Sequence, residues 1–122
     1  MDLHESGEMY LETILTLKNQ NQYVRSIDVA NALNYSKPSV SRAMKLLKES
    51  QLITIDKKGY IDFTSQGEKI ASGVYARHVT LTDFLSYIGV DKELAENDAC
   101  RIEHIISEET FQCIKEFMEK QS

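Results

Sequence analysis

The chain has 122 residues, 42% of them hydrophobic, and a net charge of −5. This length suits one ordinary domain, or a small domain with a helical extension. The sequence has no run of about eighteen apolar residues that could span a membrane, and it begins with an acidic, polar segment rather than a secretory signal. We therefore expect a cytoplasmic protein without membrane association, whose two cysteines are reduced thiols.

The charge is distributed unevenly along the chain. Residues 36–58 include six basic and two acidic side chains, a local charge of +4, whereas the other residues include eight basic and seventeen acidic side chains, a charge of −9. The acidic total alone argues against nucleic-acid binding, because phosphate groups require lysine and arginine. A basic segment on an acidic body can nevertheless bind a polyanion through that segment alone.

Apolar residues at helical spacing predict three helices in the first half of the chain. The first covers residues 3–19. The second begins at Ser26, a residue type that favours the N-cap, and the third begins at Pro38, which suits only the first turn of a helix. The residues that we expect these helices to bury are Tyr10, Leu11, Ile14, Leu15, Leu17, Val29, Ala30, Leu33, Val40, Ala43, Met44 and Leu47.

A β-hairpin is predicted next. Residues 52–64, LITIDKKGYIDFT, contain two short β-rich runs around a basic tip, where Gly59 can adopt the positive φ of a tight turn. Two helices, a tight turn, a third helix and a basic hairpin follow one another in a winged helix-turn-helix, whose helix after the turn enters the major groove of DNA. We therefore predict a winged helix-turn-helix DNA-binding domain in residues 1–65.

Residues 66–122 are predicted to be helical. The expected helices are 66–88, ended by Gly89, then 91 to about 106, then 107–120, with Cys113 packed in the core. A single winged domain makes few base contacts, so a palindromic operator is normally read by a dimer. The sequence therefore predicts an α+β fold, mainly α with a small hairpin, in which the second half is a helical dimerisation domain.

The DNA-reading stretch is NYSKPSVSRAMKLLKES, residues 34–50. Its short hydroxyl residues can approach base edges, and the free N–H groups at the helix start can bind a phosphate. Arg42 is the best candidate for reading guanine, because its planar fork matches two acceptors. The predicted DNA contacts are Ser36, Lys37, Pro38, Ser39, Ser41, Arg42, Lys45, Lys57 and Lys58. The alternative is a solvated amphipathic helix whose lysines only keep it soluble.

A second motif lies in NDACRIEHIIS, residues 97–107. On a helix, with about 100° between successive residues, Cys100, Glu103 and His104 share an arc of roughly 100°. The apolar residues of the segment should face the other way: Leu94, Ala95, Ala99, Ile102, Ile105 and Ile106. Thiolate, carboxylate and imidazole at this spacing suit a first-row transition metal, with further ligands available at Met9, Glu12 and His78.

Other interpretations of this motif are a chance grouping on a surface helix and a redox-sensing thiol at Cys100 beside Arg101, in a regulator that does not depend on metal. Nucleophilic catalysis is disfavoured, because no Gly-rich elbow or oxyanion donor accompanies the cysteine and histidine. A metal-dependent hydrolase would need a second motif for a substrate cleft. We therefore expect no enzymatic activity and no small organic ligand.

Three segments resemble the diphtheria toxin repressor and manganese transport regulator family of metal-dependent regulators. EMYLETILTL resembles the family's first helix, SKPSVSRAMKLLKESQLI its recognition helix, and ARH…IGVD…NDACRIEHIIS its metal-binding and dimerisation segment. The resemblance covers residues 6–117. It implies a homodimeric repressor that binds an operator in double-stranded DNA when metal is present and controls metal-homeostasis genes.

The resemblance also implies a ligand set. Met9, Cys100, Glu103 and His104 match the primary metal site of the iron-responsive branch, and Glu12 and His78 match metal-ligating positions of one or both branches. The manganese branch usually has aspartate and glutamate at the positions of Met9 and Cys100. Sulfur ligands favour Fe²⁺ over Mn²⁺, which prefers oxygen, and Co²⁺, Ni²⁺ or Zn²⁺ are expected to substitute in vitro.

The sequence departs from the iron branch at two points. With 122 residues it has the length of the manganese branch, so we expect the short form that lacks an SH3-like domain. At the second metal site Thr82 replaces a carboxylate and Glu96 replaces a histidine, which leaves one or two metals per subunit open. Metal binding requires a deprotonated thiol and neutral imidazoles, so metal affinity should fall as the pH falls.

Overall fold

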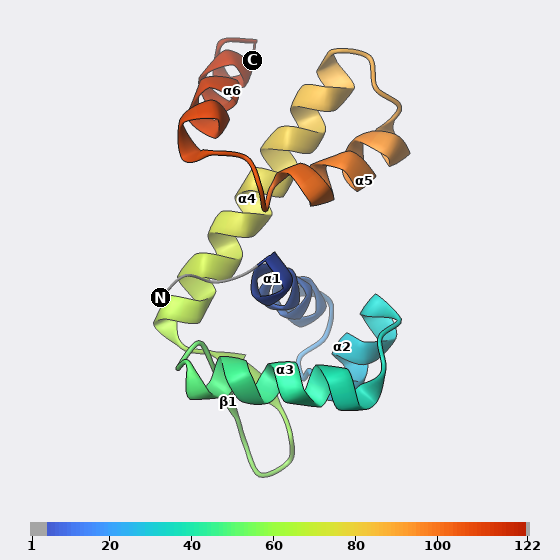
Figure 1. Cartoon of the computed structure of the whole chain (residues 1–122), viewed down its shortest axis with the longest axis vertical. Coiled ribbons are helices and arrows are strands. Elements are labelled where there is room, and N and C mark those ends of the chain that lie inside the picture. The colour runs from blue at the N-terminus through green and yellow to red at the C-terminus, as the bar shows by residue number, and fades with distance from the viewer. Residues whose placement is uncertain (1–4, 122) are drawn as a thin grey trace. The chain divides into compact units, whose positions relative to one another are not determined.

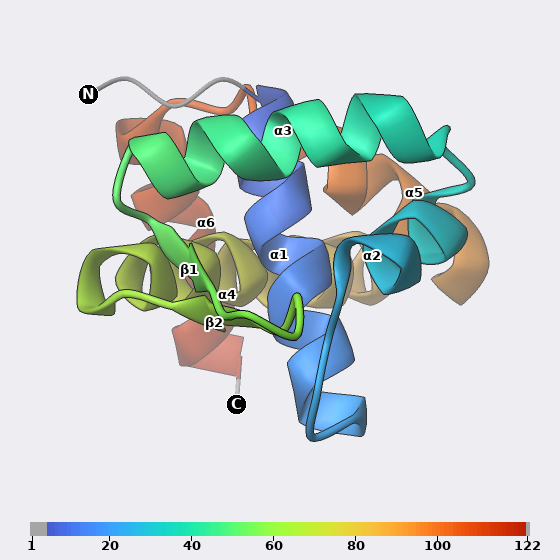
Figure 2. The same cartoon turned by 90° about the horizontal axis from the view of Figure 1, so that it is seen from below.

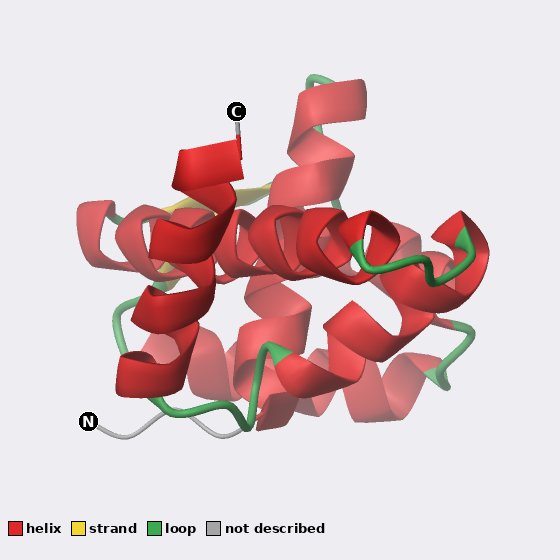
Figure 3. Cartoon of the chain, turned by 90° about the horizontal axis from the view of Figure 1, so that it is seen from above, coloured by secondary structure: helices red, strands yellow, loops and turns green. Residues whose placement is uncertain are grey.

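The computed structural model describes residues 5–121, and Figure 1 shows the order of its elements. The predicted first helix also included residues 3 and 4, which lie outside this range. Helices dominate, with one small sheet, which confirms the predicted fold class (Figure 3). The elements are α1 (Glu5–Gln20), α2 (Ser26–Leu33), α3 (Lys37–Glu49), β1 (Ile53–Ile55), β2 (Ile61–Phe63), α4 (Ser65–Tyr87), α5 (Lys92–Ile102) and α6 (Glu108–Gln121).

The chain divides into two compact units between Ser72 and Gly73, within α4. Each unit has its own apolar core. No helix of the described residues is long and apolar enough to cross a membrane.

The first unit is built around α1. Leu11 and Ile14 are fully buried, and α3 crosses α1 (Figure 2). Val40, Met44 and Leu47 form the buried stripe of α3, as their spacing predicted. The helix-turn-helix order that was predicted from the sequence is thereby confirmed.

The turn between α2 and α3 is short and internally bonded. Asn34 ends α2 in the left-handed conformation with φ of 57°, which asparagine tolerates better than most residues. The N–H of Tyr35 then donates to the carbonyl of Ala30 at 3.0 Å. Ser36 is the N-cap of α3, and its hydroxyl accepts from the N–H of Ser39. These bonds fix the direction in which α3 leaves the turn.

The start of α2 differs from the prediction in one detail. Ser26 is the first helical residue rather than the N-cap, which is Arg25. The N–H of Arg25 donates to Asp28 Oδ2 at 2.8 Å. The prediction of a serine cap was wrong, because an acidic residue in the first turn satisfies the cap instead.

The hairpin pairs β1 with β2 in antiparallel register, with Thr54 opposite Asp62. Gly59 has φ of 85° at the tip, as expected, and Asp56 Oδ1 accepts from the N–H groups of Lys58 and Tyr60. Lys18 near the end of α1 pairs with Asp62 at 3.2 Å. A hydrogen bond from the N–H of Phe63, helped by Lys18, lowers the pKa of Asp62. The hairpin is therefore fastened to α1.

The second unit has a small core in which Leu81, Ala99 and Phe111 are buried. Three predictions here were wrong. The helix predicted to continue to residue 106 ends at Ile102, and Leu94 and Ile105, which were expected to face inward, are 52% and 68% exposed. Cys113 is exposed on α6 rather than packed in the core.

Candidate metal centre and nucleic-acid interface

The second unit buries one carboxylate between two imidazoles. Glu103 is completely buried, with His78 Nδ1 2.8 Å from its Oε2 and His104 Nε2 3.3 Å from its Oε1. His78 comes from α4, whereas Glu103 and His104 come from the turn that follows α5. Burying a carboxylate is costly unless positive charge or donors compensate it. Each oxygen of the buried Glu103 carboxylate therefore needs a hydrogen-bond donor or a positive charge beside it.

Arg77 holds the turn that carries Glu103 and His104. Its Nη1 donates to the carbonyl of Glu103 at 3.2 Å, its Nη2 pairs with Glu108, and its guanidinium lies over the ring of Phe111 at 5.3 Å. Hydrogen bonds from Gln112 and then from Arg77 lower the pKa of Glu108. One arginine on α4 thus fixes both ends of the connection between α5 and α6.

The cluster suits a divalent metal ion. Glu103 Oε1 makes no hydrogen bond within the part of the chain that the structure describes, although His104 Nε2 is in ion-pairing range. A metal ion can accept an electron pair from Glu103 Oε1 and another from His104 Nε2, so one cation would satisfy both atoms at once. Two imidazole nitrogens and a carboxylate oxygen are ligands that Fe²⁺, Mn²⁺ and Zn²⁺ accept. The residues present therefore fit a metal centre.

The remaining predicted ligands come from α5 and α1. Cys100 is exposed on α5, three residues before the buried Glu103. Glu103 is the C-cap of α5 and its N–H bonds to the carbonyl of Ala99. Met9 and Glu12 are half-buried on α1 in the first unit, at the i, i+3 spacing of one helix face.

Six of the predicted DNA contacts lie at the N-cap and in the first two turns of α3: Ser36, Lys37, Pro38, Ser39, Ser41 and Arg42. Ser36 donates to Ser39 Oγ at 2.8 Å, and Arg42 Nη2 donates to the same oxygen at 3.4 Å. The guanidinium is therefore drawn toward the N-terminal end of the helix, where free N–H groups favour a phosphate. Lys37, Ser41, Arg42 and Lys45 are all exposed, as DNA contacts must be.

Aromatic residues support the basic hairpin tip. Tyr23 stacks on Tyr60 with centroids 4.5 Å apart, and Arg25 lies 4.7 Å over the Tyr60 ring. Tyr23 and Tyr60 line a hollow of about 420 Å³ with Asp56, Lys57 and Lys58. Lys57 and Lys58 are exposed on a hairpin that these aromatic contacts brace at Tyr60.

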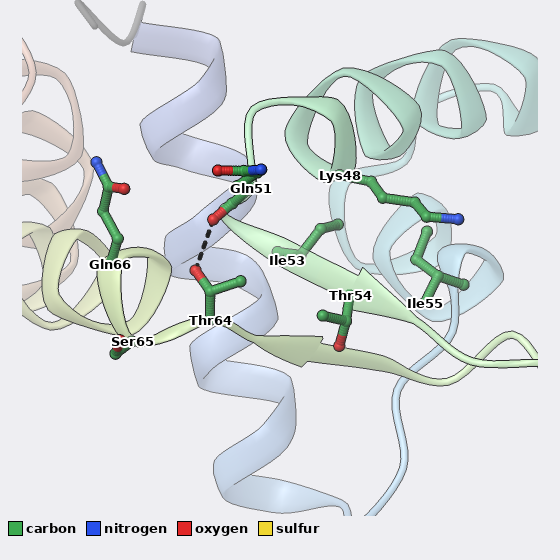
Figure 4. A pocket seen from close by; sticks show the side chains of 8 residues that line it. All are labelled: Lys48, Gln51, Ile53, Thr54, Ile55, Thr64, Ser65 and Gln66. Atoms are coloured by element: carbon green, nitrogen blue, oxygen red, sulfur yellow. Dashed lines mark hydrogen bonds between the residues drawn. The ribbon is translucent and has the colours of Figure 1, made fainter.

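A groove of about 580 Å³ lies beside the same hairpin (Figure 4). Its lining residues are Lys48, Gln51, Ile53, Thr54, Ile55, Thr64, Ser65 and Gln66. Lys48 is the one charged side chain among them, and the Thr64 hydroxyl already donates to the carbonyl of Gln51 at 2.8 Å. The groove is open and has no converging charged groups, so we assign it no ligand.

Comparison with protein families gives two adjoining matches. Residues 2–64 match the N-terminal DNA-binding domain of the iron-dependent repressor, and residues 64–122 match its metal-binding and dimerisation domain. The chain belongs to the iron-dependent repressor family. This is a family of metal-dependent transcriptional regulators rather than enzymes, and the family assignment made from the sequence is confirmed.

Individual relatives are moderately similar to the chain. The transcriptional regulator MntR of Escherichia coli is 34% identical over 111 residues, which are 91% of this chain and 72% of that protein. An uncharacterised HTH-type transcriptional regulator of Methanocaldococcus jannaschii is 31% identical over 120 residues, 97% of this chain and 96% of that protein. The relatives therefore include one of nearly the same length.

A solved structure described as a manganese-dependent transcriptional repressor in complex with manganese has a TM-score of 0.85 at 23% identity. It matches 93% of this chain, which spans about half (52%) of that protein. At this identity the likeness shows that the fold is shared.

Three contacts near the candidate metal centre and the predicted DNA-binding elements were not predicted from the sequence. They are the Arg77 clamp, the stack of Tyr23 on Tyr60, and the hydrogen bond from the Tyr35 hydroxyl to Met9 Sδ. The ARH segment was singled out for its histidine, so the neighbouring arginine was visible but had no assigned role. The two tyrosine contacts join residues far apart in the chain, and no local pattern predicts them.

Proposed function

We propose that this chain is an Fe²⁺-activated dimeric repressor that binds a palindromic operator and controls metal-homeostasis genes. The observation that carries the proposal is the buried carboxylate of Glu103 between His78 and His104. A buried pair of this kind is a poor device for stability alone, because its desolvation is costly. Its chemistry suits a cation, and its family match is to a metal-binding and dimerisation domain.

The choice of iron depends on sulfur ligands. We assign Met9, Glu12, His78, Cys100, Glu103 and His104 to metal binding, with two sulfur atoms among six donors. Soft donors favour Fe²⁺ over Mn²⁺. A repressor of the same fold is described as manganese-dependent, so Mn²⁺ is the competing activator. Glu12, Glu103 and the two histidines suit either ion.

The proposed switch operates through α1. This helix carries Met9 and Glu12, packs its buried face against the core that supports α3, and holds the hairpin through Lys18 and Asp62. A bound metal would supply the positive charge that compensates the buried Glu103 carboxylate. With Met9 and Glu12 as further ligands, it would also restrain α1. Restraining α1 restrains α3 and the hairpin, and hence the spacing of the two recognition helices in the dimer.

Metal dependence of DNA binding is the direct test. Fluorescence anisotropy of a labelled palindromic duplex, titrated anaerobically with the protein, should show operator affinity rising about 5–150-fold between chelator and micromolar Fe²⁺. Mn²⁺ in a parallel titration should activate less well. Cys100→Ala should bring operator affinity in Fe²⁺ closer to operator affinity in Mn²⁺, because it removes a sulfur donor. Equal affinity in chelator and in both metals would refute the proposal.

The same assay distinguishes the alternative, a metal-independent regulator that senses oxidation through Cys100. In that case peroxide would abolish operator binding, thiol would restore it, and neither effect would depend on metal. The exposure of Cys100 makes it accessible to oxidants, which is the one observation that favours this alternative.

Arg42 provides the test of base reading. Replacing Arg42 with alanine should weaken binding to the preferred operator by about 1–3 kcal/mol and relax specificity at one position of each half-site, because one bidentate contact is lost. The matched control is Lys58→Ala, which should weaken binding to all sequences alike and reduce the salt dependence by about one counterion. Binding curves of Arg42→Ala that keep full specificity would exclude a base-reading role.

A further inference from the structure

Tyr35 occupies a rigid position directly before the recognition helix. Its N–H bonds to the carbonyl of Ala30 at 3.0 Å, and the next residue, Ser36, is the N-cap of α3. The preceding residue, Asn34, is fixed in the left-handed conformation. A displacement of the Tyr35 ring is therefore transmitted to the start of α3 through one residue of tightly bonded chain.

The side chain of Tyr35 reaches α1. Its ring packs edge-on against Tyr10, with centroids 6.2 Å apart and planes at 78°. Its hydroxyl donates to Met9 Sδ at 3.9 Å. Tyr35 thus contacts the residue of α1 that we assign to metal binding, and it does so from the turn of the helix-turn-helix. All of these residues belong to the first unit.

We propose that Tyr35 is a positioning residue that couples the Met9 thioether to the recognition helix, an inference that rests on the proposed metal-activated function. Methionine is unbranched and adapts its conformation readily, so a free Met9 side chain samples many positions. The Tyr35 hydroxyl selects those in which the sulfur lies near the turn. A thioether sulfur has two lone pairs, so one can accept from Tyr35 while the other remains for a soft cation.

Coupling of this kind acts in both directions. If Tyr35 holds Met9 in a conformation that binds metal, then metal at Met9 holds Tyr35, and through it the start of α3, by the same free energy. The contact is long and weak, and Tyr35 is 44% exposed, so the ring has room to move when Met9 does. In the proposed mechanism the path from metal ligand to DNA-reading helix is then one side-chain contact and one peptide bond.

Tyr35→Phe removes only the hydroxyl and keeps the ring against Tyr10. We expect the ratio of operator dissociation constants in chelator and in saturating Fe²⁺ to fall about 2–30-fold relative to the wild-type ratio, with affinity in chelator unchanged. In the metal-free protein, the Met9 methyl signal in a ¹H–¹³C spectrum should shift and broaden as the side chain is released. That second readout does not depend on DNA or metal.

Tyr10→Phe is the matched control, because it removes the hydroxyl of the other ring of the same pair; it should leave both the ratio and the Met9 signal near wild type. The double variant Tyr35→Phe with Met9→Leu should lower the ratio of dissociation constants no further than Met9→Leu alone, because the two substitutions break the same contact. A wild-type ratio retained in Tyr35→Phe, or additive effects in the double variant, would overturn this inference alone. A wild-type protein with a ratio of one would overturn the proposed function and this inference with it.

Discussion

Replacing Glu103 with glutamine is expected to abolish the response of operator binding to metal. The amide has the shape of the carboxylate and fits the same buried site, but it carries no charge and offers one weak acceptor instead of two strong ones. Even residues that only support metal ligands commonly contribute 10–100-fold to affinity, so loss of a charged ligand should cost more than about 100-fold. Operator affinity in Fe²⁺ should then equal that in chelator.

Metal affinity is measured by competition with a fluorescent chelator, and folding by thermal unfolding with and without metal. Binding to the native state raises the unfolding temperature of the wild type, whereas Glu103→Gln should show no such rise. Glu116→Gln, an exposed carboxylate on α6, is the control for loss of one negative charge and should behave as wild type. Metal-dependent stabilisation that persists in Glu103→Gln would place the metal site elsewhere.

The fold was largely predictable because its helices are amphipathic and its turns have clear local signals. Val40, Met44 and Leu47 are buried where their spacing placed them, and Gly59 has the positive φ that its turn requires. The end of α5 was not predictable. Nothing in the sequence stops the helix at Ile102; the carbonyl of the next residue, Glu103, bonds to Arg77 from another helix. Helix ends that depend on tertiary contacts leave no local signal.

The residues of the candidate metal centre were predictable from the sequence, but their geometry was not. Helical spacing placed Cys100, Glu103 and His104 on one face, yet Glu103 is buried at the end of the helix and Cys100 is exposed. The position of His78 beside Glu103 depends on how α4 packs against the turn after α5. Family resemblance supplied that histidine, because related proteins preserve three-dimensional positions that spacing within one helix cannot reveal.

Gly67→Ala should be strongly destabilising, although alanine is the better helix former. Gly67 lies in the first turn of α4, where a Cβ atom would meet the carbonyl oxygen of Leu52 at 1.8 Å and its carbonyl carbon at 2.8 Å. That oxygen already accepts from the N–H of Thr64 at 3.1 Å, so neither partner can yield easily. Overpacking against backbone should cost about 3 kcal/mol, which lowers the unfolding temperature by about 10 °C.

Gly73→Ala is a control on the same helix. A Cβ atom at Gly73 meets nothing within 4 Å, so the substitution should stabilise the protein by about 0.5–1 kcal/mol through helix propensity. Urea unfolding of the two variants should therefore shift in opposite directions. Equal shifts of the urea midpoint in the two variants would mean that Gly67 does not lie this close to the Leu52 carbonyl. Because Leu52 directly precedes β1, the clash at Gly67 should also displace the hairpin, and Gly67→Ala should weaken operator binding in chelator as well as in metal.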